Sequence, residues 1–277
     1  PIYGFPGAHG KRQKYNAGLF DLKLDPDLTT NRWVYLAYAA QESETGYALR
    51  VVRGHLRDGA LTGLETLLTV GPITPVLFHF GGGLSFGPDG KLYVTAGERL
   101  LFDSEQPPET VAQNVADGRG KIYRLNPDGS IPSDNPDFGP NAVPGLYAKG
   151  IRAAQGIAMH PETGALWFTE HGTNQGDELN LLKPGTNYGW PLETTGKYRG
   201  GYEPPELNVE TTRPKWYWFQ TVAPTGLAWY FGDEFPGWRG DLLVPGLARG
   251  SLWRVHIEAE TVKSLEELLV DDRSRTR

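Results

Sequence analysis

Residues 156–172 read "GIAMHPETGALWFTEHG", and this stretch contains a complete hairpin pattern. A small residue opens it, two short apolar runs flank a turn of proline, an acidic residue and glycine, and polar residues close it. Short runs rich in β-branched and aromatic residues, bounded by turn-forming residues, are typical of β-strands. The stretch therefore predicts two neighbouring strands.

The same pattern recurs three more times, at residues 19–39, 83–98 and 226–247, the last with a longer turn. The first strands of the copies lie about 60 to 75 residues apart, which is the size of a four-stranded β-propeller blade with long loops. The sequence thus predicts an all-β fold, a β-propeller of four-stranded blades. An ordinary β-sandwich with similar hairpins is the alternative.

Further segments have the character of strands, and helices are scarce. With 36 Gly and 22 Pro spread along the chain, long helices are not expected. Residues 262–272, "VKSLEELLVDD", form the only convincing helical window, and a strand pair with a turn is its other interpretation. The most strand-like segments are residues 32–40, 90–98, 120–126, 164–172 and 250–258.

The length bounds the domain organisation. A chain of 277 residues is long enough for one large domain with a sizeable core. About four copies of the hairpin pattern are present, and a propeller must close its ring or expose an edge strand. We therefore expect residues 1–277 to form a single propeller domain that lacks the first opening strands and the last closing strands of the full fold.

Composition excludes several classes of protein. The net charge of −6, with both signs interspersed, argues against a nucleic-acid partner, which needs a basic surface. No apolar run approaches the roughly 18 to 20 residues of a membrane span, and the absence of cysteine excludes disulfides and thiolate chemistry. The opening "PIYGFPGAHG" has neither the charged start nor the apolar run of a signal peptide.

The loop "TEHGTNQGDELN", residues 169–180, carries the densest set of polar groups. It holds three carboxylates, a histidine and two glycines. Its spacing is not that of an EF-hand, but irregular glycine-containing backbone supplies the carbonyl oxygens that Ca²⁺ favours. Asp177 and Glu178 are adjacent, so in extended chain they point to opposite faces. The loop is either a metal site or a solvated polar turn.

His79 precedes three glycines in "HFGGG", residues 79–83. Successive glycines permit a bulge or the close approach of another group. A histidine there is a candidate general base, because its ordinary pKa lies near neutrality. A buried histidine that bonds a carbonyl is the structural alternative.

Two arginine-containing segments are candidates for anion binding. Arg152 and Gln155 precede a strand and could hold an anionic or carbonyl-rich ligand, or Arg152 could form a surface salt bridge. Arg273, Arg275 and Arg277 share one face if "RSRTR" is a strand, which suits a polyanion. A frayed basic tail is an equally good interpretation.

Together, the stretches 79–98, 120–136, 150–172 and 176–191 resemble the soluble pyrroloquinoline quinone (PQQ)-dependent aldose sugar dehydrogenases, the glucose/sorbosone dehydrogenase family. The resemblance runs from about Gly18 to Arg277, and "GDELNLLKPGTNYGWP" is its most specific segment. It implies a six-bladed β-propeller, a periplasmic or secreted location and a monomer or homodimer. It also implies oxidation of an aldose at the anomeric carbon to the lactone, with hydride transfer to PQQ assisted by Ca²⁺.

By resemblance, His79 is the general base and Glu98 is the neighbouring acidic residue that is usually Asp. The resemblance further implies that Gly172 and Thr173 offer backbone carbonyls to the Ca²⁺ of the cofactor. Thr173 is usually Pro, a change that a carbonyl ligand tolerates. The side chain of Glu178 and the carbonyl of Tyr188 match a second, structural Ca²⁺ site.

The resemblance assigns five further positions to the cofactor. Arg152 and Gln155 match contacting positions, and Thr221 falls in a loop that borders it. Arg275 and Arg277 match a pair that grips the PQQ carboxylates.

Three positions depart from the family pattern. Gly83 stands where the family usually has arginine, Ala153 where it has a cofactor-contacting asparagine, and Ala248 where it has lysine. Each lost charged hydrogen bond removes roughly 1.5 to 3 kcal/mol of binding energy.

These departures keep other functions open. The main alternative is a non-catalytic propeller that binds carbohydrate or protein. A propeller lactonase is a third possibility, but it needs a central set of Asp, Asn and Glu ligands spread over the blades, which the sequence does not show.

Overall fold

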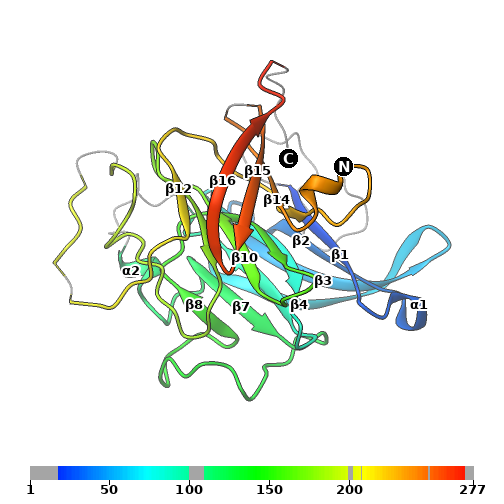
Figure 1. Cartoon of the computed structure of the whole chain (residues 1–277). Coiled ribbons are helices and arrows are strands. Elements are labelled where there is room, and N and C mark those ends of the chain that lie inside the picture. Colours follow the sequence, from blue (N-terminus) through cyan, green and yellow to red (C-terminus); the bar gives the residue numbers. More distant parts are fainter. Residues whose placement is uncertain (1–17, 100–108, 199–201, 207, 249, 272–277) are drawn as a thin grey trace.

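The computed structural model describes residues 18–99, 109–198, 202–206, 208–248 and 250–271. They form an all-β architecture of four antiparallel sheets, each of four strands that pair in chain order (Figure 1). The strands are β1 (Leu19–Leu24), β2 (Trp33–Gln41), β3 (Tyr47–Arg57) and β4 (Ala60–Thr74); β5 (Gly81–Phe86), β6 (Leu92–Ala96), β7 (Lys121–Leu125) and β8 (Leu146–Lys149); β9 (Ala154–Met159), β10 (Leu166–Glu170), β11 (Asp177–Leu181) and β12 (Trp216–Trp218); β13 (Ala228–Trp229), β14 (Leu242–Pro245), β15 (Leu252–Glu258) and β16 (Thr261–Leu268).

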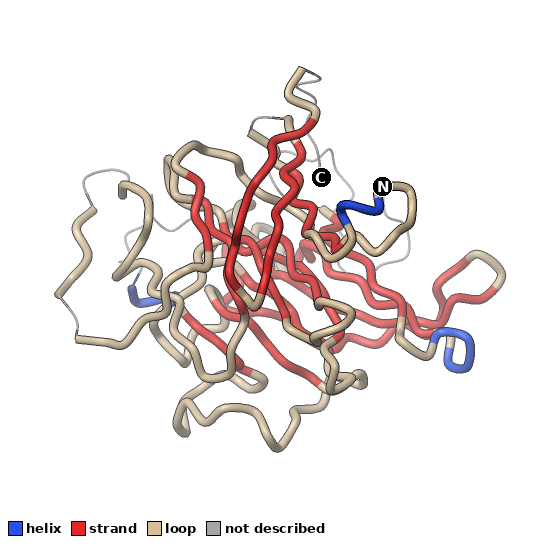
Figure 2. The backbone as a smooth tube through the Cα atoms, viewed as in Figure 1, coloured by secondary structure: helices blue, strands red, loops and turns tan. Residues whose placement is uncertain are grey.

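Helix is confined to single turns in the described residues: α1 (Leu28–Asn31), α2 (Glu109–Ala112) and the 3₁₀ turn Pro236–Trp238, as Figure 2 shows. The frequent Gly and Pro account for this, because both residues interrupt helices. Nowhere in the described segments does a helix have the length and apolarity that crossing a membrane requires.

The four hairpin copies of the sequence are the first two strands of the four sheets. Thus 19–39 contains β1 and β2, and 156–172 contains β9 and β10, which pair from Leu166 with Met159 to Glu170 with Ala154. The prediction of four-stranded repeating sheets is therefore confirmed.

The sheets follow one another in space as they do in sequence. The first strand β1 contacts β5, β5 contacts β9, and β9 contacts β13. A separate buried cluster lies at each junction, whereas a sandwich packs two sheets over one shared core. The clusters bring together Tyr35 and Leu84, Ile122 and Phe168, and Trp167 and Val255. This arrangement is consistent with a β-propeller and excludes the sandwich.

The helical prediction for residues 262–272 is wrong, because residues 261–268 form strand β16, paired with β15. Val262 and Leu265 both pack into the apolar cluster, although a spacing of three should place them on opposite faces of a strand. A β-bulge shifts the register between Val262 and Leu265, because His256 pairs with Ser264 and Ile257 with Val262. The bulge thus produces a spacing that resembles that of a helix.

The topology places several predicted site residues at one edge of the sheets. In antiparallel sheets, the start of the first strand and the end of the second lie at the same edge. His79 precedes β5 and Glu98 follows β6, while Arg152 precedes β9 and Gly172 follows β10. These loops come from successive sheets and meet because β5 packs against β9.

Candidate active site

His79 and Glu98 form a hydrogen-bonded pair at this edge. The imidazole Nδ1 lies 2.6 Å from Glu98 Oε1, and the Glu98 side chain is fully buried. With Glu98 ionised, Nδ1 carries the proton and donates a hydrogen bond to Glu98, because a carboxylate only accepts hydrogen bonds. The other ring nitrogen, Nε2, is then the one able to accept a proton. The alternative of a histidine bonded to a carbonyl does not describe this contact.

The three glycines after His79 form a bulge and also allow a close approach of neighbouring backbone. The β5–β6 register shifts between Gly81 and Leu84, which is a bulge. A Cβ at Gly81 would lie within 2.9 Å of backbone atoms of Thr95, Ala154 and Gly97. Glycine is therefore needed for β5 to approach its neighbouring strands so closely.

Arg152 links this pair to the loop after β10. Its carbonyl accepts the Glu98 N–H at 2.8 Å, and its guanidinium Nη1 donates to the carbonyls of His171 and Gly172 at 3.0 and 2.5 Å. Arg152 is 3% exposed and lies near the face of Trp190. Two carbonyls of the candidate calcium loop thus converge on a positive charge, so their position is suited to a cation.

Glu170 and Glu178 lie directly opposite each other on β10 and β11. Burial raises the pKa of Glu170 well above its ordinary value, and the nearby Glu178 raises it further. Burial also raises the pKa of Glu178. Among the described residues, Glu170 Oε2 is buried without a hydrogen-bond partner, and so is Asn180 Oδ1. Buried oxygens that lack donors fit a hard cation, which takes six to eight oxygen ligands.

A narrow cavity of about 10 Å³ lies between Arg152, Gly172, Glu178 and Tyr188. This volume suits one water molecule or ion rather than a sugar or a quinone. Gly172 of one predicted metal set and Glu178 and Tyr188 of the other line it together. Across the described part of the chain, however, no three Asp, Glu or His side chains are grouped as metal ligands. A calcium ion here would depend on backbone carbonyls.

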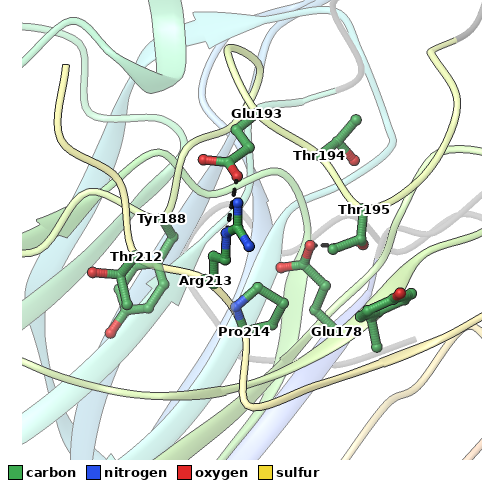
Figure 3. A pocket seen from close by; sticks show the side chains of 9 residues that line it. Glu178, Tyr188, Glu193, Thr194, Thr195, Thr212, Arg213 and Pro214 are labelled. Atoms are coloured by element: carbon green, nitrogen blue, oxygen red, sulfur yellow. Dashed lines mark hydrogen bonds and ion pairs between the residues drawn. The ribbon is translucent and has the colours of Figure 1, made fainter. Parts of the chain in front are cut away.

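Glu178 and Tyr188 also line a wider cavity of about 270 Å³, beside Glu193 and Thr195 (Figure 3). Glu178 Oε1 accepts a hydrogen bond from the Thr195 hydroxyl at 2.9 Å. In Figure 3, Glu193 is paired with Arg213 at 3.8 Å. Glu178 and Tyr188, which the resemblance assigns to one structural calcium site, therefore line the same two cavities.

Asp177 faces the other way and connects two site loops. Its Oδ1 accepts the Gly172 N–H at 2.8 Å, and its Oδ2 accepts the N–H groups of Val222 and Ala223 at 2.7 and 2.8 Å. Thr221, next to this contact, donates its hydroxyl to the Asn174 carbonyl. Asp177 thus fixes the spacing between the loop at Gly172 and the loop at Thr221.

Thr173 is buried in the same loop. Its hydroxyl donates to the Lys197 carbonyl. His171 Nε2 lies 2.7 Å from the Pro224 carbonyl oxygen. Because a carbonyl only accepts hydrogen bonds, Nε2 carries the proton and donates it. Burial lowers the pKa of His171 to about 4. His171 is therefore neutral near pH 7 and ties its loop to Pro224.

Gln155 does not lie with Arg152. It lines a separate cavity of about 300 Å³ between the first strands, next to Asp21, Lys23 and Thr225. Gln155 is the second residue of β9, so it lies within the strand, whereas Arg152 is in the preceding loop. Arg152 and Gln155 are three residues apart in the sequence but thus line different cavities.

The three departures occupy different environments. A Cβ at Gly83 would lie 2.7 Å from the Gln155 carbonyl oxygen, so an arginine at this position would require β5 and β9 to separate. Ala153 is fully buried, and its carbonyl accepts the His171 N–H at 3.1 Å. Ala248 is exposed beside Val222, to whose carbonyl it donates its N–H. Arg275 and Arg277 lie outside the described residues.

Two residues of the site were missed from sequence. Asp177 was noted only for pointing away from Glu178, and Glu170 only as one of three carboxylates. The pairing of Glu170 with Glu178 depends on the register of β10 with β11. The turn between these strands is irregular, so the sequence offered no rule for that register.

Comparison with known proteins gives consistent matches. The glucose/sorbosone dehydrogenase family model matches residues 1–277. The aldose sugar dehydrogenase YliI of Escherichia coli is 34% identical over 288 residues, which cover 100% of this chain and 74% of YliI. A crystal structure of a glucose dehydrogenase superposes with a TM-score of 0.89 at 35% identity, covering 99% of this chain and 79% of the other. The PQQ-bound aldose sugar dehydrogenase of Streptomyces coelicolor superposes with a TM-score of 0.74 at 27% identity, covering 98% and 71%.

Proposed function

The chain belongs to the glucose/sorbosone dehydrogenase family, and on this premise we propose that it is a PQQ-dependent aldose dehydrogenase. The observation that carries the proposal is the His79–Glu98 pair, 2.6 Å apart, beside the two carbonyls that converge on Arg152. A general base can take the hydroxyl proton of a sugar, and backbone carbonyls beside it would hold a Lewis-acidic cation, so the two features together support this proposal.

In the proposed reaction, the anomeric carbon of an aldose loses a hydride and its hydroxyl loses a proton, which leaves the lactone. PQQ, when bound, would supply the hydride acceptor, and Ca²⁺ would supply a Lewis acid for it. His79 Nε2 receives the hydroxyl proton. Glu98 keeps Nδ1 protonated and stabilises the imidazolium that results, so the pair acts as base and orienter.

The oxygen atoms of the chain fit a calcium ion in two respects. The carbonyls of His171 and Gly172 already face a positive charge, and Glu170 has a buried oxygen without a described partner. A Ca²⁺ ion bound by the Gly172 carbonyl would compete with the Arg152 guanidinium for that oxygen, and a displaced guanidinium would be able to bind an anionic group of the cofactor.

The proposal extends to the residues that hold the ligands. Gly172 and Thr173 contribute carbonyls to the active-site ion, and Glu178 with the Tyr188 carbonyl holds a structural ion. Thr221 borders the cofactor through the loop that Asp177 fixes. Arg275 and Arg277 remain predicted contacts of the PQQ carboxylates, as does Gln155, although it lines a different cavity from Arg152.

Several properties implied by the family stay predictions. The described residues form four sheets, so a six-bladed ring is a proposal. A periplasmic or secreted location and a monomeric or homodimeric state are also proposals. An aldose is the proposed substrate, without a preference among aldoses.

The test is reconstitution of the protein with PQQ and Ca²⁺, followed by a panel of aldoses and an artificial electron acceptor. Dye reduction with at least one aldose, lost in His79→Ala while PQQ still binds, supports the proposal. If no aldose gives dye reduction, the proposal fails.

A non-catalytic propeller that binds carbohydrate or protein is the second candidate, favoured by Ala153 and Ala248 at positions where the family pattern has polar cofactor contacts. Titration of the protein with PQQ, followed by absorbance or calorimetry, separates the two functions. Tight PQQ binding excludes the non-catalytic version, and absence of binding supports it.

A further inference from the structure

Arg99 is a buried arginine that follows Glu98 directly, and it is 2% exposed. Its guanidinium donates to three backbone carbonyls rather than to solvent: Nε to Phe78 at 3.0 Å, Nη1 to Tyr47 at 3.3 Å, and Nη2 to Val76. Its Cζ lies 3.5 Å from the centroid of the Phe80 ring, a cation–π contact. The side chain therefore contacts sheet β1–β4 as well as the segment before β5.

These contacts enclose His79 on both sides. Phe78 precedes it and Phe80 follows it, and Arg99 binds the carbonyl of the first and the ring of the second. The neighbouring backbone adds to this, because the Gly97 N–H donates to the Phe80 carbonyl at 2.9 Å. Residues 97–99 thus hold residues 78–80 through three sets of contacts, made by Gly97, Glu98 and Arg99, and the Glu98–His79 hydrogen bond lies between the other two.

The segment needs such support because His79 has a left-handed backbone, with φ of 47°. This conformation is unfavourable for a residue other than glycine by about 1 kcal/mol or more, and it persists only where surrounding contacts enforce it. Without enforcement, His79 would relax toward negative φ and its ring would leave Glu98.

We propose that Arg99 is a positioning residue for His79: by fixing the carbonyls of Val76 and Phe78 and the ring of Phe80, it sets the backbone conformation that aims the imidazole at Glu98. The inference deepens the proposed function, on which it rests for the role of His79 as base.

Arginine suits this place better than lysine. A guanidinium presents five N–H donors in a flat fork, so it reaches several carbonyls while it stacks on an aromatic ring. Burial lowers the pKa of Arg99 to about 9, and the neighbouring Glu98 opposes this shift. The side chain therefore remains largely charged near neutral pH. A lysine would retain the charge but only part of the contacts.

The variants are Arg99→Met, which removes the charge and the donors, and Arg99→Lys, which keeps the charge. Arg124→Lys is the matched control. Arg124 is also buried and bonded, to Asp89 and Asp134, and it lies over Tyr147, but near the opposite end of β7 from the site. The Arg124→Lys variant reports the general effect of weakening a buried arginine of the β5–β8 sheet, away from the site.

In the enzyme loaded with PQQ and Ca²⁺, we expect kcat with glucose to fall about 100-fold in Arg99→Met, because displacement of a catalytic group by about 1 Å has effects of that size. Arg99→Lys should lose about tenfold, and KM should change less than kcat in both. Arg124→Lys should keep kcat within about twofold. A loss in KM alone, or an equal loss in Arg124→Lys, would overturn the inference.

The second measurement needs no cofactor. Long-range ¹H–¹⁵N spectra of histidine-labelled protein distinguish the two neutral tautomers of an imidazole, and His79→Asn identifies the signal. We expect a single Nδ1–H tautomer for His79 in the unsubstituted protein and in Arg124→Lys, and a mixture in Arg99→Met. If Arg99→Met keeps the unsubstituted spectrum, Arg99 does not position His79.

The two measurements keep the inference and the proposed function apart. If the unsubstituted protein oxidises no aldose, the proposed function fails, and the His79 spectra still decide whether Arg99 sets the ring. If Arg99→Met does not fold, Arg99→Lys provides the same comparison with a smaller expected change.

Discussion

The contact between Glu98 and His79 yields the most direct prediction. Glu98→Gln keeps the size and shape of the side chain and replaces the carboxylate by an amide. Since the amide oxygen can still accept the Nδ1 proton, the substitution removes charge while one hydrogen bond remains possible. The 2.6 Å contact and the complete burial of Glu98 make the charge effective, because no solvent screens it.

The size of the effect follows from that geometry. A hydrogen bond to a charged group contributes about 1.5 to 3 kcal/mol, and a neutral one about 0.5 to 1.5 kcal/mol. The difference, about 1 to 1.5 kcal/mol, corresponds to about a 5- to 13-fold change in rate. Because the imidazolium forms only as the proton is transferred, we expect this loss in kcat rather than in KM.

The assay is steady-state dye reduction with glucose by the protein loaded with PQQ and Ca²⁺, with PQQ affinity measured separately. Glu98→Gln should lower kcat by the stated factor and leave PQQ affinity unchanged. The same substitution in the His79→Ala background should have no further effect on the residual rate, since Glu98 acts through His79.

A full additional loss in that background would show that Glu98 acts on the substrate or cofactor directly. An unchanged kcat in the single variant would remove Glu98 from the mechanism. Either result refutes the reasoning given for the pair.

Three further predictions concern stability and metal binding. Asp177→Asn leaves backbone N–H groups without a charged acceptor, and the free energy of unfolding in urea should fall by about 2 to 4 kcal/mol, with faster hydrogen exchange at the two loops it joins; unchanged exchange would contradict the role of Asp177. Glu170 and Glu178 have raised pKa values, so their contribution to stability is complete below about pH 4.5 and is lost as pH rises through the folded values. Metal-free protein should therefore be less stable at about pH 8 than at about pH 5, and Ca²⁺ or Glu178→Gln should reduce that difference; a slope insensitive to both would exclude these carboxylates as its source. Gly83→Ala places a Cβ 2.7 Å from a backbone oxygen and should lower the free energy of unfolding by about 1 to 3 kcal/mol, whereas Gly226→Ala, which meets nothing within 4 Å, should change it by less than about 0.5 kcal/mol; equal effects would show that the close approach of β5 and β9 is not limiting.

The sheets were predictable because hairpin patterning is local. Each hairpin copy carries its own turn residues and its own alternation of apolar side chains, so no long-range information is needed. Residues 262–272 show where this fails, since β16 carries a bulge: Ser264 pairs with His256 and Val262 with Ile257, so Lys263 is the extra residue. The bulge is defined by the pairing with β15, which the residues of the window do not reveal.

The candidate site was predictable only in part. The resemblance named His79 and Glu98 as catalytic residues, and in the structure their side chains lie 2.6 Å apart. Glu170 escaped notice because its importance comes from the register of two strands. Gln155 was grouped with Arg152 by nearness in sequence, although entry into β9 turns it toward a different cavity.

Because the loops of the site belong to successive sheets, we expect folding to have two separable stages. Each sheet is built from neighbouring hairpins and can form early, since its contacts are close in sequence. His79, Arg152 and the loop at Val222 meet only after β5, β9 and β13 have docked. Ligand binding therefore reports the docking of sheets, and a partly docked chain would have full β circular dichroism and no capacity to bind a cofactor. We therefore expect cofactor binding to be a cooperative property of the docked sheets and not of any one repeat.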